Sequence, residues 1–308
     1  MNRTTQLAID SCWLHAHRRV ARSHNASEYW HAAAHSRHAM HHDQVAQEQR
    51  RMDAHSRKTS GDTAERQRLQ REAEYHDRRF GENTRSSTDK FYAITQTSFA
   101  WYHQRLLENV SGLRVLEYGC GPGDIAFAAA QLGAVAHGID ISPVAINQAR
   151  EHAAGSGLHA AFSVDNAEQT SFADASFDRI GGSGILHHLN LHKAYAEIAR
   201  LLRPGGRAVF LEPLGHNPLI NAYRDRTPLM RTEDEHPLLR NDLRECTRHF
   251  SRVRPRFFHC LSLAAVPLRN TAAFRPALAV LSGLDRLLLS AHAPTRWLAW
   301  MVVLECER

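Results

Sequence analysis

The sequence predicts an α/β fold: a doubly wound, mostly parallel seven-stranded sheet with helices on both faces, plus an N-terminal helical lid or extension. Two observations lead to this prediction. Short apolar strands alternate with helix-length segments over residues 110–212, and a glycine-rich turn joins the first strand to the first helix. A chain of 308 residues with 43% hydrophobic content can also bury one large core.

Residues 1–60 are expected to form a polar extension rich in histidine and arginine. Four histidines in it recur at helical spacing and would share one helix face: His31, His35, His38 and His42. One interpretation is a metal-binding stripe. The favoured interpretation is a solvated helical face, because no carboxylate or cysteine completes a ligand set there. No metal site is therefore predicted.

Residues 61–109 are expected to be helical and to form a lid segment, and residues 110–308 to form the main domain. The first strand of that domain, residues 115–118, enters a turn that contains Gly119, Gly121 and Gly123. A helix follows, and the second strand ends in Asp140. This is the layout of a βαβ unit that binds a nucleotide cofactor. Glycines let the backbone approach the ligand, and the acid accepts hydrogen bonds from ribose hydroxyls.

The spacing of the glycines distinguishes between cofactors. They alternate strictly, unlike the Gly-x-Gly-x-x-Gly of dinucleotide sites, and Glu117 precedes them. A carboxylate at this turn would repel a pyrophosphate, but it suits a cationic ligand such as S-adenosylmethionine (SAM), which carries a sulfonium and an ammonium group. The stretch resembles the first motif of the class I SAM-dependent methyltransferases, Val-Leu-Glu/Asp-x-Gly-x-Gly-x-Gly.

Four later segments continue the resemblance in the family's order: residues 140–146, 162–167, 177–189 and 201–210. The resemblance implies SAM as cofactor, and it implies a binding set of Tyr75, Tyr92, Glu117, Gly119, Cys120, Gly121, Asp140, Ile141, Asp165, Asn166, Ala167 and Ser183.

Two short stretches depart from the family pattern. Asp165-Asn166-Ala167 replaces the commoner Asp-Ala, so the adenine contact can shift by one residue. Ser183-Gly184 replaces a bulkier pair, which leaves the backbone to line the pocket there.

The lid segment also resembles a part of these methyltransferases that folds over the cofactor. Its pattern is Glu-x-x-Tyr-His-Asp over residues 72–77, followed by aromatic residues near Tyr92. The ring faces of Tyr75 and Tyr92 can hold a sulfonium by cation–π attraction, worth about 1–2 kcal/mol when desolvated. The alternative is ordinary packing of these rings onto the core.

A polar insertion over residues 213–250 follows the fifth predicted strand, and loops of this length are usually functional. In the resembled family, insertions here cover the acceptor. The candidates for substrate contact are Glu212, Asn217, Tyr223 and Arg224. A hydroxyl acceptor also needs a base that works near neutral pH, for which the candidates are His187, His188 and His216.

The predicted function is therefore a SAM-dependent methyltransferase with a small-molecule acceptor, modified on oxygen, nitrogen or carbon. One alternative is a cyclase that consumes SAM and releases methylthioadenosine. Another is a non-catalytic partner subunit, although such a subunit has no use for Glu117, the glycine turn and Asp140.

The composition limits the kinds of partner that we expect. The net charge is +6, but no basic patch interleaved with aromatics accompanies it, so no nucleic-acid partner is expected. Five scattered cysteines favour a reduced, cytoplasmic protein. No apolar run is long enough to span a membrane, so no integral membrane contact is expected, while the apolar residues 278–289 leave peripheral contact open. The oligomeric state is left open.

Overall fold

The computed structural model describes residues 63–81, 93–156, 158, 160–227, 232, 234–291 and 294–308. The chain divides into two compact units, residues 1–66 and 67–308, and the sheet and cavity described below belong to the second. The extension predicted over residues 1–60 lies outside the described residues, as does Tyr92. The helices within the described residues are all too short or too polar to cross a membrane.

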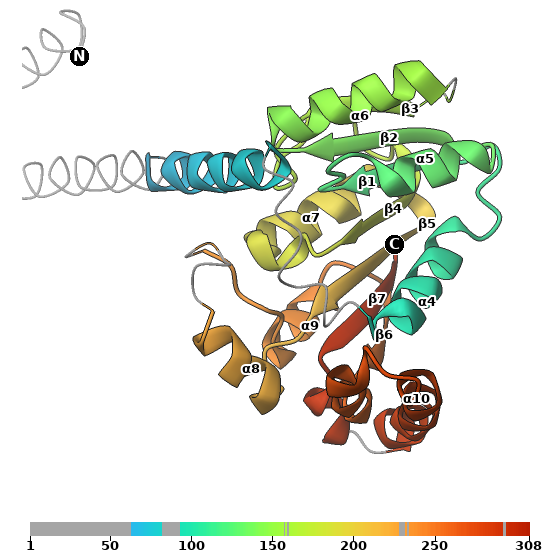
Figure 1. Cartoon of the computed structure of the whole chain (residues 1–308). Helices are drawn as coiled ribbons and strands as arrows, with labels where there is room; N and C mark the ends of the chain where they lie inside the picture. Colours follow the sequence, from blue (N-terminus) through green and yellow to red (C-terminus); the bar gives the residue numbers. More distant parts are fainter. Residues whose placement is uncertain are drawn as a thin grey trace, which may run out of the picture. The chain divides into compact units, whose positions relative to one another are not determined.

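A seven-stranded sheet forms the centre of the second unit, with strand order β3-β2-β1-β4-β5-β7-β6 (Figure 1). Its strands are β1 Arg114–Tyr118, β2 Val135–Asp140, β3 Ala160–Val164, β4 Phe177–Ser183, β5 Leu202–Pro213, β6 Arg252–Phe258 and β7 Met301–Glu307. Strands β1 to β5 are parallel to one another, and β7 runs antiparallel to both β5 and β6. The predicted fold class is confirmed, and the sheet is mixed because of β7.

The helices alternate with the strands along the chain (Figure 1). They are α4 Gln96–Leu107, α5 Asp124–Gln131, α6 Pro143–Ser156, α7 Leu191–Leu201, α8 Pro218–Asp225, α9 Arg240–Cys246 and α10 Phe274–Ala291. A further helix covers residues 63–81. The insertion predicted over residues 213–250 contains α8 and α9, and a short 3₁₀ helix, η2 Leu186–His188, follows β4.

The side-chain alternation of the strands buries both faces of the sheet. In β1, Leu116 packs in the cluster that includes α7, whereas Val115 packs in the cluster that includes α5 and α6. Successive residues of a strand point to opposite faces, so a strand covered on both sides must be apolar throughout. Helix α7 matches this surface with a buried stripe at helical spacing, which includes Leu191, Ala194, Ile198 and Leu201.

The strand order reverses at β1. The chain moves outward through β2 and β3 and then returns to place β4 on the other side of β1. The loops after β1 and β4 therefore diverge from adjacent strands and leave a crevice at the carboxyl edge of the sheet. This crevice is where a doubly wound fold binds its ligands.

Candidate active site

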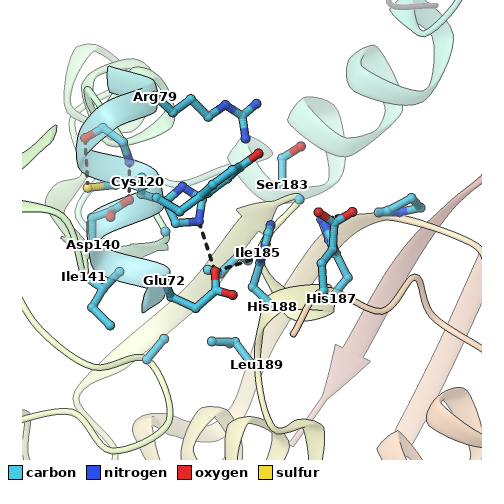
Figure 2. Close-up of a pocket in the computed structure, with 18 of the residues that line it drawn as sticks. Glu72, Arg79, Cys120, Asp140, Ile141, Ser183, Ile185, His187, His188 and Leu189 are labelled. Atoms are coloured by element: carbon cyan, nitrogen blue, oxygen red, sulfur yellow. Dashed lines mark hydrogen bonds and ion pairs between the residues drawn. The ribbon is translucent and has the colours of Figure 1, made fainter. Parts of the chain in front are cut away.

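A cavity of about 1030 Å³ lies at the carboxyl ends of the parallel strands (Figure 2). Its walls come from the loops after β1 to β4, from helix 63–81 and from α8. Every described residue that the sequence assigned to the cofactor lines it, namely Tyr75, Glu117, Gly119, Cys120, Gly121, Asp140, Ile141, Asp165, Asn166, Ala167 and Ser183. Residues dispersed over about a third of the sequence, from Tyr75 to Ser183, thus meet in one place.

The turn after β1 needs its glycines. Gly119 has φ +61° and Gly121 has φ +49°, the left-handed region that side chains disfavour. A Cβ on Gly119 would lie 2.7 Å from the Ile185 side chain, and one on Gly121 would lie 3.0 Å from the Phe80 ring. The turn therefore presents bare backbone to the cavity.

Asp140 ties this turn to the end of β2. Its Oδ2 accepts a hydrogen bond from the Gly121 N–H at 2.9 Å, and its Oδ1 accepts one from the Ser142 N–H at 2.9 Å. The carboxylate is buried but lines the cavity, and each oxygen keeps a second lone pair for a ligand hydroxyl.

Glu117 has a second role that its sequence position did not reveal. Its carboxylate accepts the Ala126 N–H at 2.8 Å and the Ile125 N–H at 3.4 Å, in the first turn of α5. Burial raises the pKa of Glu117 to about 8, although these two N–H groups lower it. The side chain therefore holds the start of α5 against β1 as well as lining the cavity.

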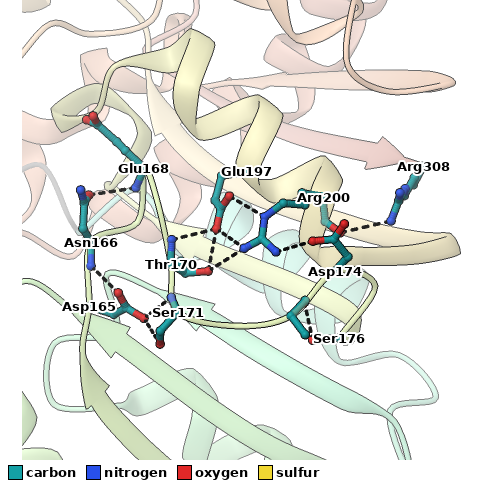
Figure 3. A network of polar contacts seen from close by, with 11 residues as sticks. Asp165, Asn166, Glu168, Thr170, Ser171, Asp174, Ser176, Glu197, Arg200 and Arg308 are labelled. Atoms are coloured by element: carbon teal, nitrogen blue, oxygen red, sulfur yellow. Dashed lines mark hydrogen bonds and ion pairs between the residues drawn. The ribbon is translucent and has the colours of Figure 1, made fainter. Parts of the chain in front are cut away.

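The loop after β3 is held by a polar network (Figure 3). Asp165 Oδ2 accepts the N–H and the hydroxyl of Ser171 at 3.0 and 2.8 Å, and Asp165 Oδ1 accepts the Asn166 N–H. Further along, Glu197 binds the Thr170 hydroxyl at 2.6 Å and Arg200 at 2.6 Å. The network fixes the orientation of Asp165 and Asn166 before any ligand arrives.

Helix 63–81 is fastened along the cavity by polar contacts. Asp77 accepts hydrogen bonds from the Ser142 hydroxyl and from the Val144 N–H, which lies 3.3 Å away. Nearer the start of the helix, Arg68 pairs with the buried Glu168 at 2.5 Å. These contacts hold Tyr75 in the cavity wall.

On the other side of the cavity, Glu212 orients His187. Glu212 is fully buried at the end of β5, and its Oε1 accepts the N–H groups of Ile185 and Leu186, both at 2.9 Å. Its Oε2 lies 2.7 Å from His187 Nδ1. When Glu212 is ionised it can only accept, which assigns the proton to Nδ1 and leaves the lone pair on Nε2, 3.8 Å from Glu235 Oε1.

The electrostatics keep His187 neutral. Burial, together with the neighbouring Arg224 and His236, lowers the pKa of His187 to about 3. Burial raises the pKa of Glu212 to about 7, against the backbone N–H groups that it accepts. At neutral pH the imidazole is therefore neutral.

His188 faces helix 63–81 instead. Its Nδ1 lies 3.2 Å from Glu72 Oε2, and His76 Nε2 lies 3.6 Å from the same oxygen. Burial, helped by His187, lowers the pKa of His188, while Glu72 opposes the shift. Burial alone would raise the pKa of Glu72, but contacts with His188, His76 and Thr232 hold it well below its ordinary value, so Glu72 is ionised.

The structure divides the other predicted residues into two groups. Tyr223 and Arg224 line the cavity, whereas Glu212, Asn217 and His216 do not. Asn217 instead caps α8, accepting the N–H groups of Leu219 and Ile220. The ring of His216 instead lies 5.2 Å from that of Trp297.

Several lining residues were not among the predicted ones: Glu72, His76, Phe99, Glu235 and Trp300. The only sequence signal for any of them was the Glu-x-x-Tyr-His-Asp pattern, which places Glu72 and His76 four residues apart and therefore on one helix face.

Residues 115–206 match the protein family described as "Methyltransferase domain". This part of the chain is a class I SAM-dependent methyltransferase domain. Two curated relatives overlap it. Aklanonic acid methyltransferase of Streptomyces sp. (strain C5) is 40% identical over 113 residues, which are 35% of this chain and 51% of that protein. A ubiquinone biosynthesis O-methyltransferase of Xanthomonas axonopodis pv. citri (strain 306) is 36% identical over 110 residues, 35% of this chain and 46% of that protein.

The chain spans about half the length of these curated relatives. Solved structures extend the likeness of the fold beyond the matched residues. The geranyl diphosphate C-methyltransferase of Streptomyces coelicolor A3(2) has a TM-score of 0.53 at 15% identity, covering 78% of this chain and 98% of that one. Phosphoethanolamine N-methyltransferase 2 of Haemonchus contortus has a TM-score of 0.51 at 17% identity, covering 75% and 60%.

The methyltransferase domain uses SAM, and the cavity fits it. Gly119, Gly121 and Asp140 all line the cavity, so the backbone of the turn and the candidate acceptor for ribose hydroxyls lie on the same wall. Glu117 and Tyr75 line the same cavity, and Tyr75 offers a ring face to a cation.

Proposed function

We propose that the protein is a SAM-dependent methyltransferase that modifies a hydroxyl group on a small, largely apolar acceptor. The observation that carries the proposal is the Glu212–His187 pair, which presents a neutral imidazole nitrogen to the cofactor cavity. SAM supplies the electrophilic methyl group when bound. The chain's part is to position the acceptor and to take its proton at His187 Nε2.

Glu212 acts as a positioning residue in this proposal. It is too buried to touch an acceptor, but its contact with Nδ1 fixes the ring and the tautomer of His187. A general base of this kind typically contributes about 10²–10⁴-fold to a rate.

The size and lining of the cavity support methyl transfer over cyclisation of SAM. Ligand pockets typically measure about 300–1,000 Å³, and this cavity of about 1030 Å³ is at the top of that range. Its lining includes apolar and aromatic groups, among them Phe99, Tyr223, Trp300 and Met301. A cyclase acting on SAM alone needs no such acceptor wall.

The named relatives guide the choice of acceptor. One is named for aklanonic acid and the other for ubiquinone biosynthesis, where it is an O-methyltransferase. An acceptor with an apolar body and a hydroxyl also suits the aromatic wall and the base.

The test is incubation of the full chain with SAM, alone and with a panel of hydroxylated ring compounds, followed by mass spectrometry. We expect S-adenosylhomocysteine and an acceptor gaining one methyl group, with little of either when no acceptor is present. Methylthioadenosine from SAM alone would instead identify a cyclase. A chain that binds SAM but yields neither product with any acceptor of the panel would contradict the proposal.

A further inference from the structure

One buried cluster beside the base is not used by the proposed reaction. Glu72 and His76 lie four residues apart on one face of helix 63–81, and His188 reaches them from η2 (Figure 2). One ligand atom from each of the three lies within 4.8 Å of the other two. All three residues line the cavity, so the cluster is open to it.

The spacing within the cluster is that of ligands around a single ion. Glu72 Oε2 lies 3.2 Å from His188 Nδ1 and 3.6 Å from His76 Nε2. Metal–nitrogen and metal–oxygen bonds to Zn²⁺ are about 2.0–2.2 Å, which places two ligands of a tetrahedral ion about 3.4 Å apart. Charge-assisted hydrogen bonds are shorter, at about 2.7–2.9 Å.

Two of the three ligand atoms, those of Glu72 and His188, lack a hydrogen bond of good geometry among the described residues. Both oxygens of Glu72 and the Nδ1 of His188 are buried. Within the part of the chain that the structure describes, none of these three atoms has a hydrogen-bond partner of good geometry. Glu72 is only 4% exposed and His188 only 6%. A buried carboxylate whose contacts with imidazoles at 3.2 and 3.6 Å are not well-aligned hydrogen bonds gains from a shared cation between them.

We propose that Glu72, His76 and His188 bind one divalent transition-metal ion of the Zn²⁺ type. Two imidazoles and a carboxylate form a borderline donor set that such ions prefer over Mg²⁺ or Ca²⁺. Three protein ligands leave a fourth position for a water or a substrate, as in catalytic zinc sites.

The location gives the ion a role in the proposed methyl transfer, on which this step rests. The rings of His187 and His188 lie 4.3 Å apart, so an ion held by His188 would lie near the proposed base. An acceptor hydroxyl bound to the ion becomes more acidic and loses its proton to His187 Nε2, which leaves the oxygen as nucleophile. The ion therefore selects acceptors that carry a metal-binding oxygen.

The experiment measures metal binding separately from activity. The full chain is used with His31, His35, His38 and His42 changed to Gln, and with the exposed His192 also changed to Gln, because these histidines offer other sites for metal. This background protein is titrated with Zn²⁺ by calorimetry, its metal content is measured after dialysis, and Co²⁺ is added as an optical probe.

We expect one tightly bound ion in the background protein. Glu72→Gln and His76→Gln should each weaken Zn²⁺ binding at least about 100-fold, since outer-shell partners alone typically account for 10–100-fold. His187→Gln should leave the affinity unchanged. Circular dichroism checks that each variant is folded.

Two results would overturn the metal proposal. One is the same Zn²⁺ affinity with and without Glu72→Gln, which would make the cluster a buried ion pair only. The other is loss of binding in His187→Gln but not in His76→Gln, which would assign the ion to His187, His188 and Glu235. Methylation of the hydroxylated ring compounds, measured separately from Zn²⁺ binding, tests the proposed function, so the failure of either proposal can be told from the failure of the other.

Discussion

The two walls of the cavity differ in what they present to a ligand. The cofactor wall, made by the turns after β1 and β2, presents backbone, glycine and the carboxylate of Asp140. The acceptor wall, made by helix 63–81, η2 and α8, presents histidines, acids and aromatic rings. The first is a shape that consecutive residues form, and the second is an assembly of side chains from distant segments.

Each wall nevertheless uses a buried glutamate in the same way. Glu117 accepts two N–H groups at the start of α5, and Glu212 accepts two at the start of η2. The two glutamates differ in what else they contact. Glu117 holds the turn of the cofactor wall, whereas Glu212 also contacts His187 Nδ1 and so fixes the orientation of that ring. This comparison predicts that a substitution in one wall changes either kcat or the Kd for SAM without changing the other.

The largest effect is expected from His187→Asn. Loss of the base should lower kcat about 10²–10⁴-fold while the Kd for SAM stays unchanged, because His187 belongs to the acceptor wall. Steady-state kinetics and calorimetry measure the two quantities. His192→Asn serves as the control, since that side chain is 76% exposed. A matching rise in the Kd for SAM would show that the walls are not independent.

The next effect concerns pH and stability. The folded-state pKa values of Glu212, about 7, and Glu117, about 8, lie above the ordinary 4.5, so folding favours their protonated forms. Their stabilising contribution is present below pH 4.5 and is lost as pH rises through 7 and 8. The free energy of unfolding should therefore fall by a few kcal/mol over this range.

Denaturant unfolding at several pH values measures this fall. Glu212→Gln should remove the part of the fall that ends near pH 7, and Glu117→Gln the part that ends near pH 8. If both variants keep the full wild-type slope, the titrating groups lie elsewhere.

Asp140→Ala should act on the cofactor wall alone. It removes the acceptor for the ribose hydroxyls and frees the N–H groups of Gly121 and Ser142, so the Kd for SAM should rise at least about tenfold, or about 1.4 kcal/mol. Calorimetry checks this against Asp174→Ala, an acid that is 77% exposed. Equal affinities in the two variants would refute the assignment of Asp140 to the ribose.

The smallest effect is expected where the walls meet. Asp77→Ala removes the contact of helix 63–81 with the loop after β2, and the Kd for SAM should rise about two- to tenfold, the range of one net hydrogen bond. Glu74→Gln on the exposed side of the same helix is the matched control. An unchanged Kd in Asp77→Ala would mean that the helix does not cover the cofactor.

Much of the cofactor wall could be predicted from the sequence. The turn at Gly119 and Gly121 and the acid at Asp140 follow strands by short, fixed spacings, and parallel strands bring their carboxyl ends to one edge. The placement of Tyr92 stays a prediction. The contact of Glu117 with the first turn of α5 was not predicted, because the spacing of residues along the chain does not show which carboxylate oxygen accepts a helix N–H.

The acceptor wall was predicted only in part. Tyr223, Arg224, His187 and His188 do line the cavity, but Glu72 and Glu235 were missed. Asn217 turned out to cap α8, which a polar residue before a helix-initiating proline does readily.

The sequence by itself determined the strand–turn–helix units, the sheet they build and the cofactor edge, because local spacing and hydrophobic pattern control all three. Only the tertiary structure decided that Glu212 stands behind His187 and that Glu72 and His76 meet His188. These contacts join segments far apart in the chain, and their geometry depends on how helix 63–81 and β5 pack around the cavity. The physical reason is that burial, nearby charges and hydrogen bonds set the pKa of a buried carboxylate, and the sequence alone does not show which residues will surround it.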